Sequence, residues 1–151
     1  MSTMTAQATQ VYNIFINATP EQIWEAITTP EFTTKYFYSS AVDTTCEVGT
    51  PWRGWSEDRK QQLVDGEVLE SDPPRLLRHT WRALYDGETA VEPYSRVTWE
   101  LEPAGEGITK LTVVHDELEQ SPKTAASVEG GWSWVLSGLK TLLETGKPLS
   151  G

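Results

Sequence analysis

The chain has 151 residues, a net charge of −10 at neutral pH, seven tryptophans and a single cysteine, Cys46. This length is typical of one domain, and one cysteine excludes a disulfide framework or a multi-cysteine metal site. The excess of acidic residues argues against binding nucleic acid through its phosphates. Because no window holds the roughly 20 apolar residues of a membrane span, we expect a cytoplasmic protein that does not insert into membranes.

The N-terminal region divides into a polar segment and a first strand. Residues 1–10 carry no apolar run, and we expect them to be disordered or extended ahead of a single domain over residues 11–149. Residues 11–17 are rich in β-branched and aromatic side chains, which favours a strand.

Two helix starts follow this strand. Thr19 and Gln22 have the spacing of a capping box, and Pro20 occupies the first helical position. The same signal returns at Thr29 and Pro30. The sequence therefore predicts two short helices, each entered through a proline.

The middle of the chain reads as strands joined by turns. Gly66 lies inside one of the strands, where it indicates a bulge or a close backbone approach. A turn or loop is expected over residues 86–93. The predicted strands cover residues 41–47, 52–56, 61–71, 76–84, 95–102 and 108–118.

The last element is an amphipathic helix that ends at Gly146, where glycine and the nearby Pro148 form a stop signal. The pair Gly130-Gly131 marks either the beginning of this helix or an interruption in it. Trp134 falls off the apolar face. That face consists of Val128, Trp132, Val135, Leu136, Leu139, Leu142 and Leu143.

Sequential strands with short connections make an antiparallel meander, and one face of that sheet must be buried. Only the C-terminal helix is long and apolar enough to cover it. The sequence thus predicts an α+β fold, in which a curved antiparallel sheet wraps around the C-terminal helix.

Alternation along the last three strands separates inward from outward side chains. Both histidines fall on the inward side, where each is either a satisfied core residue or a polar group in an apolar pocket. A shared metal site is not expected, because the two strands flank a third and their backbones are about 10 Å apart. The inward set is Leu77, His79, Trp81, Val97, Trp99, Leu101, Leu111, Val113 and His115.

The order of these elements resembles the helix-grip fold of the START-like (SRPBCC) superfamily, and within it the bacterial branch of the activator-of-heat-shock-ATPase-like family. The resemblance rests on residues 16–24, 65–77, 111–115 and 131–146. It implies a cavity between the sheet and the C-terminal helix that holds hydrophobic or amphipathic small molecules. Some members of the superfamily are cyclases, dehydratases or hydrolases, and the eukaryotic relative stimulates a chaperone ATPase.

The leading hypothesis is binding of an aromatic or lipid-like molecule, without catalysis, cofactor or metal. Tryptophan faces would stack on the ligand, an imidazole would bind its polar end, and Gly130-Gly131 would act as a hinge at the entrance. The candidate ligand-binding residues are Tyr36, Phe37, Leu77, His79, Trp81, Val97, Trp99, Val113, His115, Trp132, Leu136 and Leu139.

Two alternatives remain open at this stage. One is an enzyme of the polyketide cyclase or hydrolase type, with His79 or His115 as acid or base, since histidine titrates near neutral pH. No catalytic residue is assigned for it. The other is a chaperone-accessory or regulator-interaction module, as a homodimer or with a protein partner, for which an exposed Trp52 or Trp134 would be the sign.

Overall fold

The computed structural model describes residues 7–149 and contains one seven-stranded antiparallel sheet in the order β1-β7-β6-β5-β4-β3-β2. Strands β2 to β7 are neighbours in chain order, as expected of a meander, and β1 joins the sheet by pairing with β7. The strands are β1 (Gln10–Ile16), β2 (Ala41–Thr44), β3 (Pro51–Trp55), β4 (Gln62–Asp72), β5 (Leu76–Ala83), β6 (Ser95–Gly105) and β7 (Ile108–Asp116).

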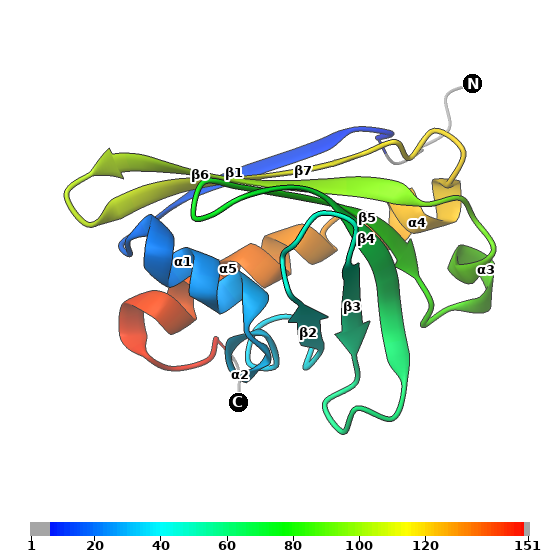
Figure 1. Ribbon diagram of the computed structural model, residues 1–151, viewed down its shortest axis with the longest axis horizontal. Helices are drawn as coiled ribbons and strands as arrows, with labels where there is room; N and C mark the ends of the chain where they lie inside the picture. The colour runs from blue at the N-terminus through cyan, green and yellow to red at the C-terminus, as the bar shows by residue number, and fades with distance from the viewer. Residues whose placement is uncertain (1–6, 150–151) are drawn as a thin grey trace.

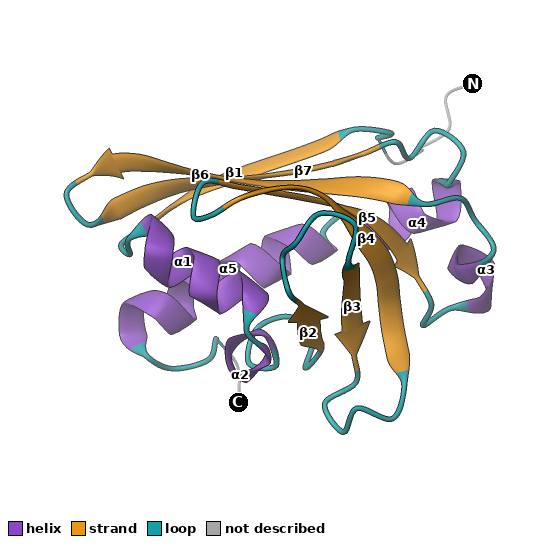
Figure 2. Ribbon diagram, in the orientation of Figure 1, coloured by secondary structure: helices purple, strands orange, loops and turns teal. Residues whose placement is uncertain are grey.

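The sheet arches over three of the five helices. Figure 1 shows α1, α2 and α5 beneath the concave face, while α3 and α4 lie at one end of the sheet. Figure 2 shows β2 and β3 continuing the curve of the sheet down beside the helices. The helices are α1 (Pro20–Thr28), α2 (Pro30–Thr33), α3 (Gly87–Ala90), α4 (Pro122–Val128) and α5 (Gly131–Thr145). This is the predicted α+β architecture.

Several local signals in the sequence act as expected. The Thr19 hydroxyl accepts a hydrogen bond from the backbone N–H of Gln22, whose side chain accepts one from the Thr19 N–H. At Gly66 the backbone of β5 approaches so closely that a Cβ atom would lie 1.9 Å from the carbonyl oxygen of Thr80. The capping box and the close approach at Gly66 are therefore confirmed.

The region expected to be a loop contains a single helical turn, α3. It forms because the Asp86 side chain accepts from the backbone N–H of Glu88 and the Thr89 hydroxyl donates to the carbonyl of Ala83. The first bond caps the turn, and the second fastens it to the end of β5. The sequence predicted a turn or loop here, but not that the turn would be helical.

The glycine pair marks the beginning of the long helix. Gly130 has φ +80° and serves as the N-cap of α5, which ends at Gly146 with φ +79°. Val128 belongs to the preceding helix α4, so it is not part of the α5 face on which the periodicity placed it. The chain turns at Glu129 and Gly130, and this turn separates the two helices.

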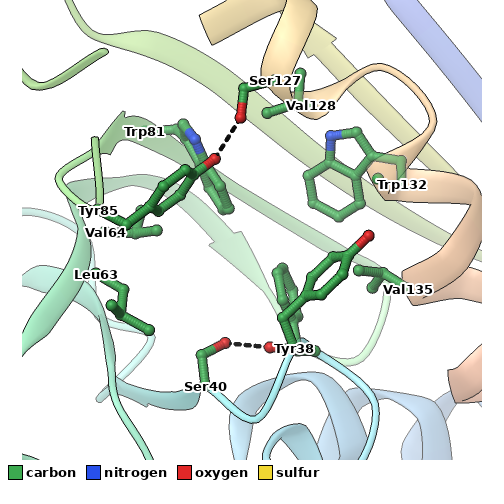
Figure 3. Close-up of a pocket in the computed structure, with 12 residues that line it drawn as sticks. Tyr38, Ser40, Leu63, Val64, Trp81, Tyr85, Ser127, Val128, Trp132 and Val135 are labelled. Carbon is green, nitrogen blue, oxygen red and sulfur yellow. Dashed lines mark hydrogen bonds between the residues drawn. The ribbon is translucent and has the colours of Figure 1, made fainter. Parts of the chain in front are cut away.

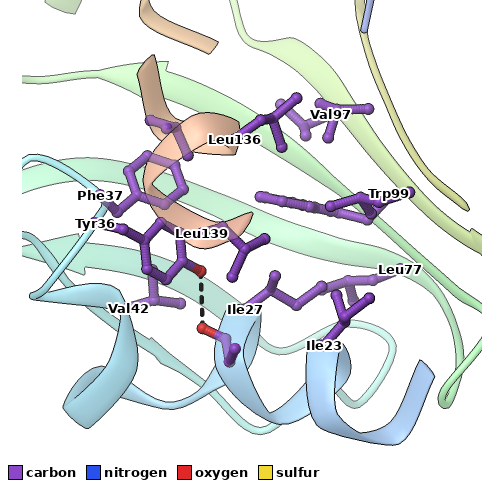
Figure 4. Close-up of a cluster of buried hydrophobic side chains, with 14 of the residues drawn as sticks. Ile23, Ile27, Tyr36, Phe37, Val42, Leu77, Val97, Trp99, Leu136 and Leu139 are labelled. Carbon is purple, nitrogen blue, oxygen red and sulfur yellow. Dashed lines mark hydrogen bonds between the residues drawn. The ribbon is translucent and has the colours of Figure 1, made fainter. Parts of the chain in front are cut away.

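The main core lies between the concave face of the sheet, α1 and α5. Leu77 and Trp99 from the sheet and Leu139 from α5 are almost completely buried, and Figure 4 shows them converging with Ile23 of α1. The hydroxyl of Tyr36 donates to the carbonyl of Ala26 at 2.8 Å. All nine residues of the predicted inward set are buried, as alternation requires.

Two expectations concern the ends of the chain and the membrane. Residues 1–6 of the expected N-terminal segment lie outside the described residues, and Gln10 already belongs to β1. Between residues 7 and 149, no helix combines the length and the apolar character needed to cross a membrane.

Candidate functional site

Both histidines are fully buried beneath the sheet, and each accepts a hydrogen bond from a tryptophan. The indole N–H of Trp99 donates to Nε2 of His79 at 3.0 Å. Because an indole can only donate, this nitrogen must be the unprotonated one. The other nitrogen, Nδ1, therefore carries the hydrogen and donates to the carbonyl of Thr80 at 2.9 Å.

His115 has the opposite tautomer for the same reason. The indole N–H of Trp132 donates to its Nδ1 at 3.0 Å, and its Nε2–H donates to the hydroxyl of Ser95 at 2.7 Å. The Ser95 hydroxyl in turn donates to the carbonyl of Trp81. Both nitrogens of His115 and the hydroxyl of Ser95 therefore have hydrogen-bond partners.

These contacts hold both imidazoles in the neutral form. Burial lowers the pKa of His79 from 6.5 to about 4. Burial, together with the nearby charge of His79, lowers the pKa of His115 to about 3. Both groups are satisfied core histidines, the first of the two roles that the sequence left open.

A pocket opens beside this core, between the sheet and the beginning of α5. Its volume is about 360 Å³, within the range of small-molecule sites. Trp81 of β5 and Trp132 of α5 lie together at one end, with ring centroids 5.8 Å apart, and Figure 3 shows Tyr38 and Leu63 at the other end. The lining consists of Phe37, Tyr38, Ser40, Leu63, Val64, Trp81, Tyr85, Ser127, Val128, Gly131, Trp132 and Val135.

Three of the twelve predicted site residues line this pocket: Phe37, Trp81 and Trp132. The structure places the other nine outside its lining, in the packed core between the sheet, α1 and α5. Neither imidazole reaches the pocket. The residues outside the lining are Tyr36, Leu77, His79, Val97, Trp99, Val113, His115, Leu136 and Leu139.

Sequence reasoning missed the residues contributed by loops and by α4. Tyr85 lies four residues after Trp81, on the same side of the alternation as the inward residues of β5. Extending the alternation past the end of the strand would therefore have found it. Tyr38, with φ +51°, belongs to the segment between α2 and β2, for which the sequence has no periodic signal. Ser127 lies on α4, and its hydroxyl shares a 2.7 Å hydrogen bond with that of Tyr85.

The pocket is apolar and uncharged. Among the described residues that line it, none is an Asp, Glu, Lys, Arg or His. Its polar side-chain groups are the hydroxyls of Tyr38, Ser40, Tyr85 and Ser127. The indole N–H of Trp81 is buried behind the ring, and it has no hydrogen-bond partner among the described residues. Within the same residues, no three His, Cys, Asp or Glu side chains converge as a metal site requires.

The fold, the sheet order and the helix beneath the sheet agree with one known family. Residues 17–144 match the model of the family described as "Activator of Hsp90 ATPase homolog 1-like protein". The chain belongs to this family. The resemblance drawn from its sequence motifs is therefore confirmed.

Several solved structures share the architecture. Protein MLL2253 from Mesorhizobium loti is 25% identical, with a TM-score of 0.73 over 90% of this chain and 96% of that one. The Aha1 dimer from Colwellia psychrerythraea is 20% identical, with a TM-score of 0.72 over 93% and 99% of the two chains. Comparison with the curated proteins gives no match.

DynU16, a protein of the dynemicin biosynthetic locus, is also similar. It is 24% identical with a TM-score of 0.72, and the match covers 94% of this chain but 49% of DynU16. At this identity the similarity shows a shared fold. The same fold thus occurs in proteins from quite different settings.

Proposed function

We propose that this family member binds a hydrophobic or amphipathic small molecule in the pocket beneath Trp81 and Trp132. The observation that carries the proposal is an uncharged pocket of about 360 Å³ with aromatic walls, located between the sheet and α5. Apolar pockets of this size with a few polar groups are typical of ligand sites. Phe37 lies against both tryptophans, with ring centroids 5.7 Å from Trp132 and 6.2 Å from Trp81.

A pocket-filling substitution tests this proposal. Leu63 is half-buried at the edge of the pocket, so Leu63→Trp places a large ring in the space without forcing it into the closed core. We expect wild-type protein to increase the fluorescence of the neutral dye Nile red, and Leu63→Trp to remove that increase. The matched control is Leu69→Trp, because Leu69 lies on the same strand, is exposed and lies outside the pocket lining.

Circular dichroism checks that both variants keep the wild-type fold. If the dye responds equally to the wild type and to a folded Leu63→Trp protein, the ligand does not occupy this pocket and the proposal is wrong.

The structure gives less support to the enzyme with a catalytic histidine. A general acid or base must reach the proton that it transfers, and its pKa works best near the operating pH. His79 and His115 are both enclosed, both hydrogen-bonded on each nitrogen, and both neutral far below pH 7.

A second candidate function is association with another protein chain. Trp134 is 45% exposed and, with Tyr38 and Leu149, lines a second hollow beside the first turns of α5. We propose a second copy of this chain as its partner, since a protein of the same fold was determined as a dimer. Sedimentation velocity tests this: we expect a dimer for the wild type and a monomer for Trp134→Ser. A monomeric wild type at high concentration contradicts it.

A further inference from the structure

The two edges of the sheet differ in how much of their backbone is already bonded. At one edge, β2 has only four residues, and the N–H of Val42 donates to the hydroxyl of Thr33. At the other edge, β1 has seven residues and pairs with β7 on one side alone. A long strand with free N–H and C=O groups is a template for pairing with another chain. The free side of β1 is therefore the edge at which another strand could add to the sheet.

One contact with α5 shows which residues of β1 point to this free side. Lys140 Nζ donates to the carbonyl of Phe15 at 2.9 Å. Because backbone groups alternate from side to side along a strand, Val11 and Asn13 face the same way as Phe15. Among residues 7–149, no other group bonds to the backbone of these three residues on that side.

The side chains of the same three residues lie on the face of the sheet away from the helices. Val11 is 56% exposed and Phe15 is 54% exposed, with the exposed Asn13 between them. Tyr12 and Ile14 lie on the other face and pack partly against the core. The free backbone of β1 is thus accompanied by an exposed row of one polar and two apolar side chains.

This order of residues is complementary to itself. When a second copy of β1 runs antiparallel with the two-fold axis at Asn13, Phe15 lies opposite the partner's Val11. On the other face, Tyr12 lies opposite the partner's Ile14. Aromatic side chains opposite β-branched ones stabilise antiparallel strands, and in this register each free N–H meets a carbonyl. A second copy of this chain is therefore the partner that fits the edge.

Lys140 occupies the position that this pairing needs. The Phe15 carbonyl would have to accept from the N–H of the partner's Val11, but it already accepts from the Lys140 ammonium. The same ammonium pairs at 2.7 Å with Glu144, whose carboxylate accepts from the N–H of Asn17. An approaching strand would remove water from this ammonium in both copies, which is unfavourable. Charged side chains, lysine above all, commonly protect sheet edges in this way.

We propose that Lys140 guards the free edge of β1 and prevents it from pairing with β1 of a second copy. The guard belongs to α5, so the helix that fills the concave face also controls whether the sheet continues into another molecule. Neither the pocket nor the Trp134 hollow includes a residue of β1, so the inference is independent of both proposed functions.

Removal of the ammonium tests the guard. Lys140→Met keeps a long side chain that favours helices and removes the charge. We expect sedimentation velocity to show a species of roughly double the wild-type mass, in an amount that increases with protein concentration. The matched control is Lys123→Met, which removes an ammonium of α4 that pairs with Glu88 at 3.1 Å and should keep the wild-type mass. A folded Lys140→Met protein with the wild-type mass overturns the proposal.

A second substitution shows whether the larger species forms through β1. The N–H of Asn13 points to the free side, so Asn13→Pro removes it without breaking a bond to β7. Added to Lys140→Met, this change should restore the wild-type mass, with circular dichroism confirming the fold. If the double variant stays as large as Lys140→Met, the association uses another surface and the proposal is wrong.

Cross-linking at single cysteines determines the register. With Cys46→Ser and Lys140→Met in place, a short bismaleimide should join two chains through Asn13→Cys but not through Val11→Cys. The two copies of residue 11 would lie about 13 Å apart, at roughly 3.3 Å per residue along the strand. Equal cross-linking at both positions contradicts a pairing centred on Asn13.

The same reaction measures the guard itself. Restoring Lys140 should slow cross-linking through Asn13→Cys roughly fivefold, the size expected of one exposed charged contact. An unchanged rate means that Lys140 does not control the edge. Should Lys140→Met not fold, Lys140→Ala takes its place in each experiment, because alanine also favours helices.

Discussion

Single residues of the core determine how stability depends on pH, and the two histidines dominate this dependence. Burial lowers the pKa of His79 to about 4 and that of His115 to about 3, both below the ordinary value of 6.5. The unfolded chain therefore binds protons below pH 6.5 that the folded chain does not. The stabilisation is fully present above pH 6.5 and is lost as the pH falls toward 4.

We expect the free energy of unfolding to decrease on the order of 3 kcal/mol between pH 7 and pH 5. Urea titrations followed by circular dichroism measure this change. The variants His79→Gln and His115→Gln should be less stable at pH 7 but lose less stability on acidification. If a variant has the same pH dependence as the wild type, the imidazole it lacks is not the titrating group.

A second residue-scale prediction concerns Gly66 in β4. A Cβ atom there would lie 1.9 Å from the backbone oxygen of Thr80 in β5, which cannot move without separating the strands. We expect Gly66→Ala to lower the free energy of unfolding by more than about 2 kcal/mol. Gly54→Ala is the control, because its Cβ would meet Val64 at an ordinary 3.5 Å. Urea unfolding should show a much larger loss of stability for Gly66→Ala than for Gly54→Ala. An equal loss of unfolding free energy in the two variants would show that the close approach is absent.

Among the elements, the junction between α4 and α5 depends on one backbone conformation. Gly130 has φ +80°, which strains any residue with a side chain, whereas Gly131 lies in the first turn of α5. We expect Gly130→Ala to destabilise the protein by about 1 kcal/mol. Gly131→Ala should be neutral or slightly stabilising, since alanine favours helices and its Cβ would lie 3.6 Å from the Tyr38 hydroxyl. Thermal unfolding distinguishes the two variants. If Gly131→Ala were the more destabilised, the positive φ of Gly130 would be contradicted.

Hydrogen exchange at the same junction tests the proposed hinge at the pocket entrance. Gly130 provides no side-chain cap, so the first amides of α5 lack the protection that a capping residue gives. We expect Gly131 and Trp132 amides to exchange with deuterium much faster than that of Val113 in the sheet, and to slow when a ligand occupies the pocket. Exchange as slow as in the strands would rule out a hinge.

The elements also show which features a sequence can predict. Alternation predicted the buried face of β5 to β7, because it depends only on the strand geometry of consecutive residues. Within the predicted turn or loop, the helical form of α3 was not predicted, since it also depends on the bond between Thr89 and the carbonyl of Ala83. The candidate pocket was located only in part for the same reason. Trp81 and Trp132 lie on β5 and α5, whose periodicity marks buried positions, whereas Tyr38 lies in the connection between α2 and β2 and Ser127 reaches the pocket from the separate helix α4.

For the histidines, the sequence predicted position but not bonding. Placing His79 and His115 inward follows from alternation. Each histidine accepts a hydrogen bond from a tryptophan only because Trp99 lies in the strand next to His79 and Trp132 of α5 packs against His115. Such pairing becomes visible only when the register of the sheet and the rotation of the helix are known.

At the scale of the whole molecule, α5 closes one part of the sheet and leaves another part open. Its second half, with Leu139 and Leu142, packs into the core that α1 seals. Its first half, with Trp132 and Val135, forms a wall of the pocket instead. α4 ends at Val128, the chain turns at Glu129 and Gly130, and Ser127 and Val128 of α4 line the pocket beside α5. A ligand there would touch the sheet, α4 and α5 at once.

A ligand that bridges these elements should stabilise the entire domain, because the pocket does not exist in the unfolded chain. At a ligand concentration one hundred times the Kd, the stabilisation is about 2.7 kcal/mol, which raises the Tm of a domain of this size by roughly 5–10 °C. We expect this increase with Nile red in the wild type and none in Leu63→Trp. The increase should be nearly the same in low and high NaCl, since no described lining residue is charged. Differential scanning calorimetry measures it, and an increase that disappears with salt would indicate binding to the charged surface rather than in the pocket.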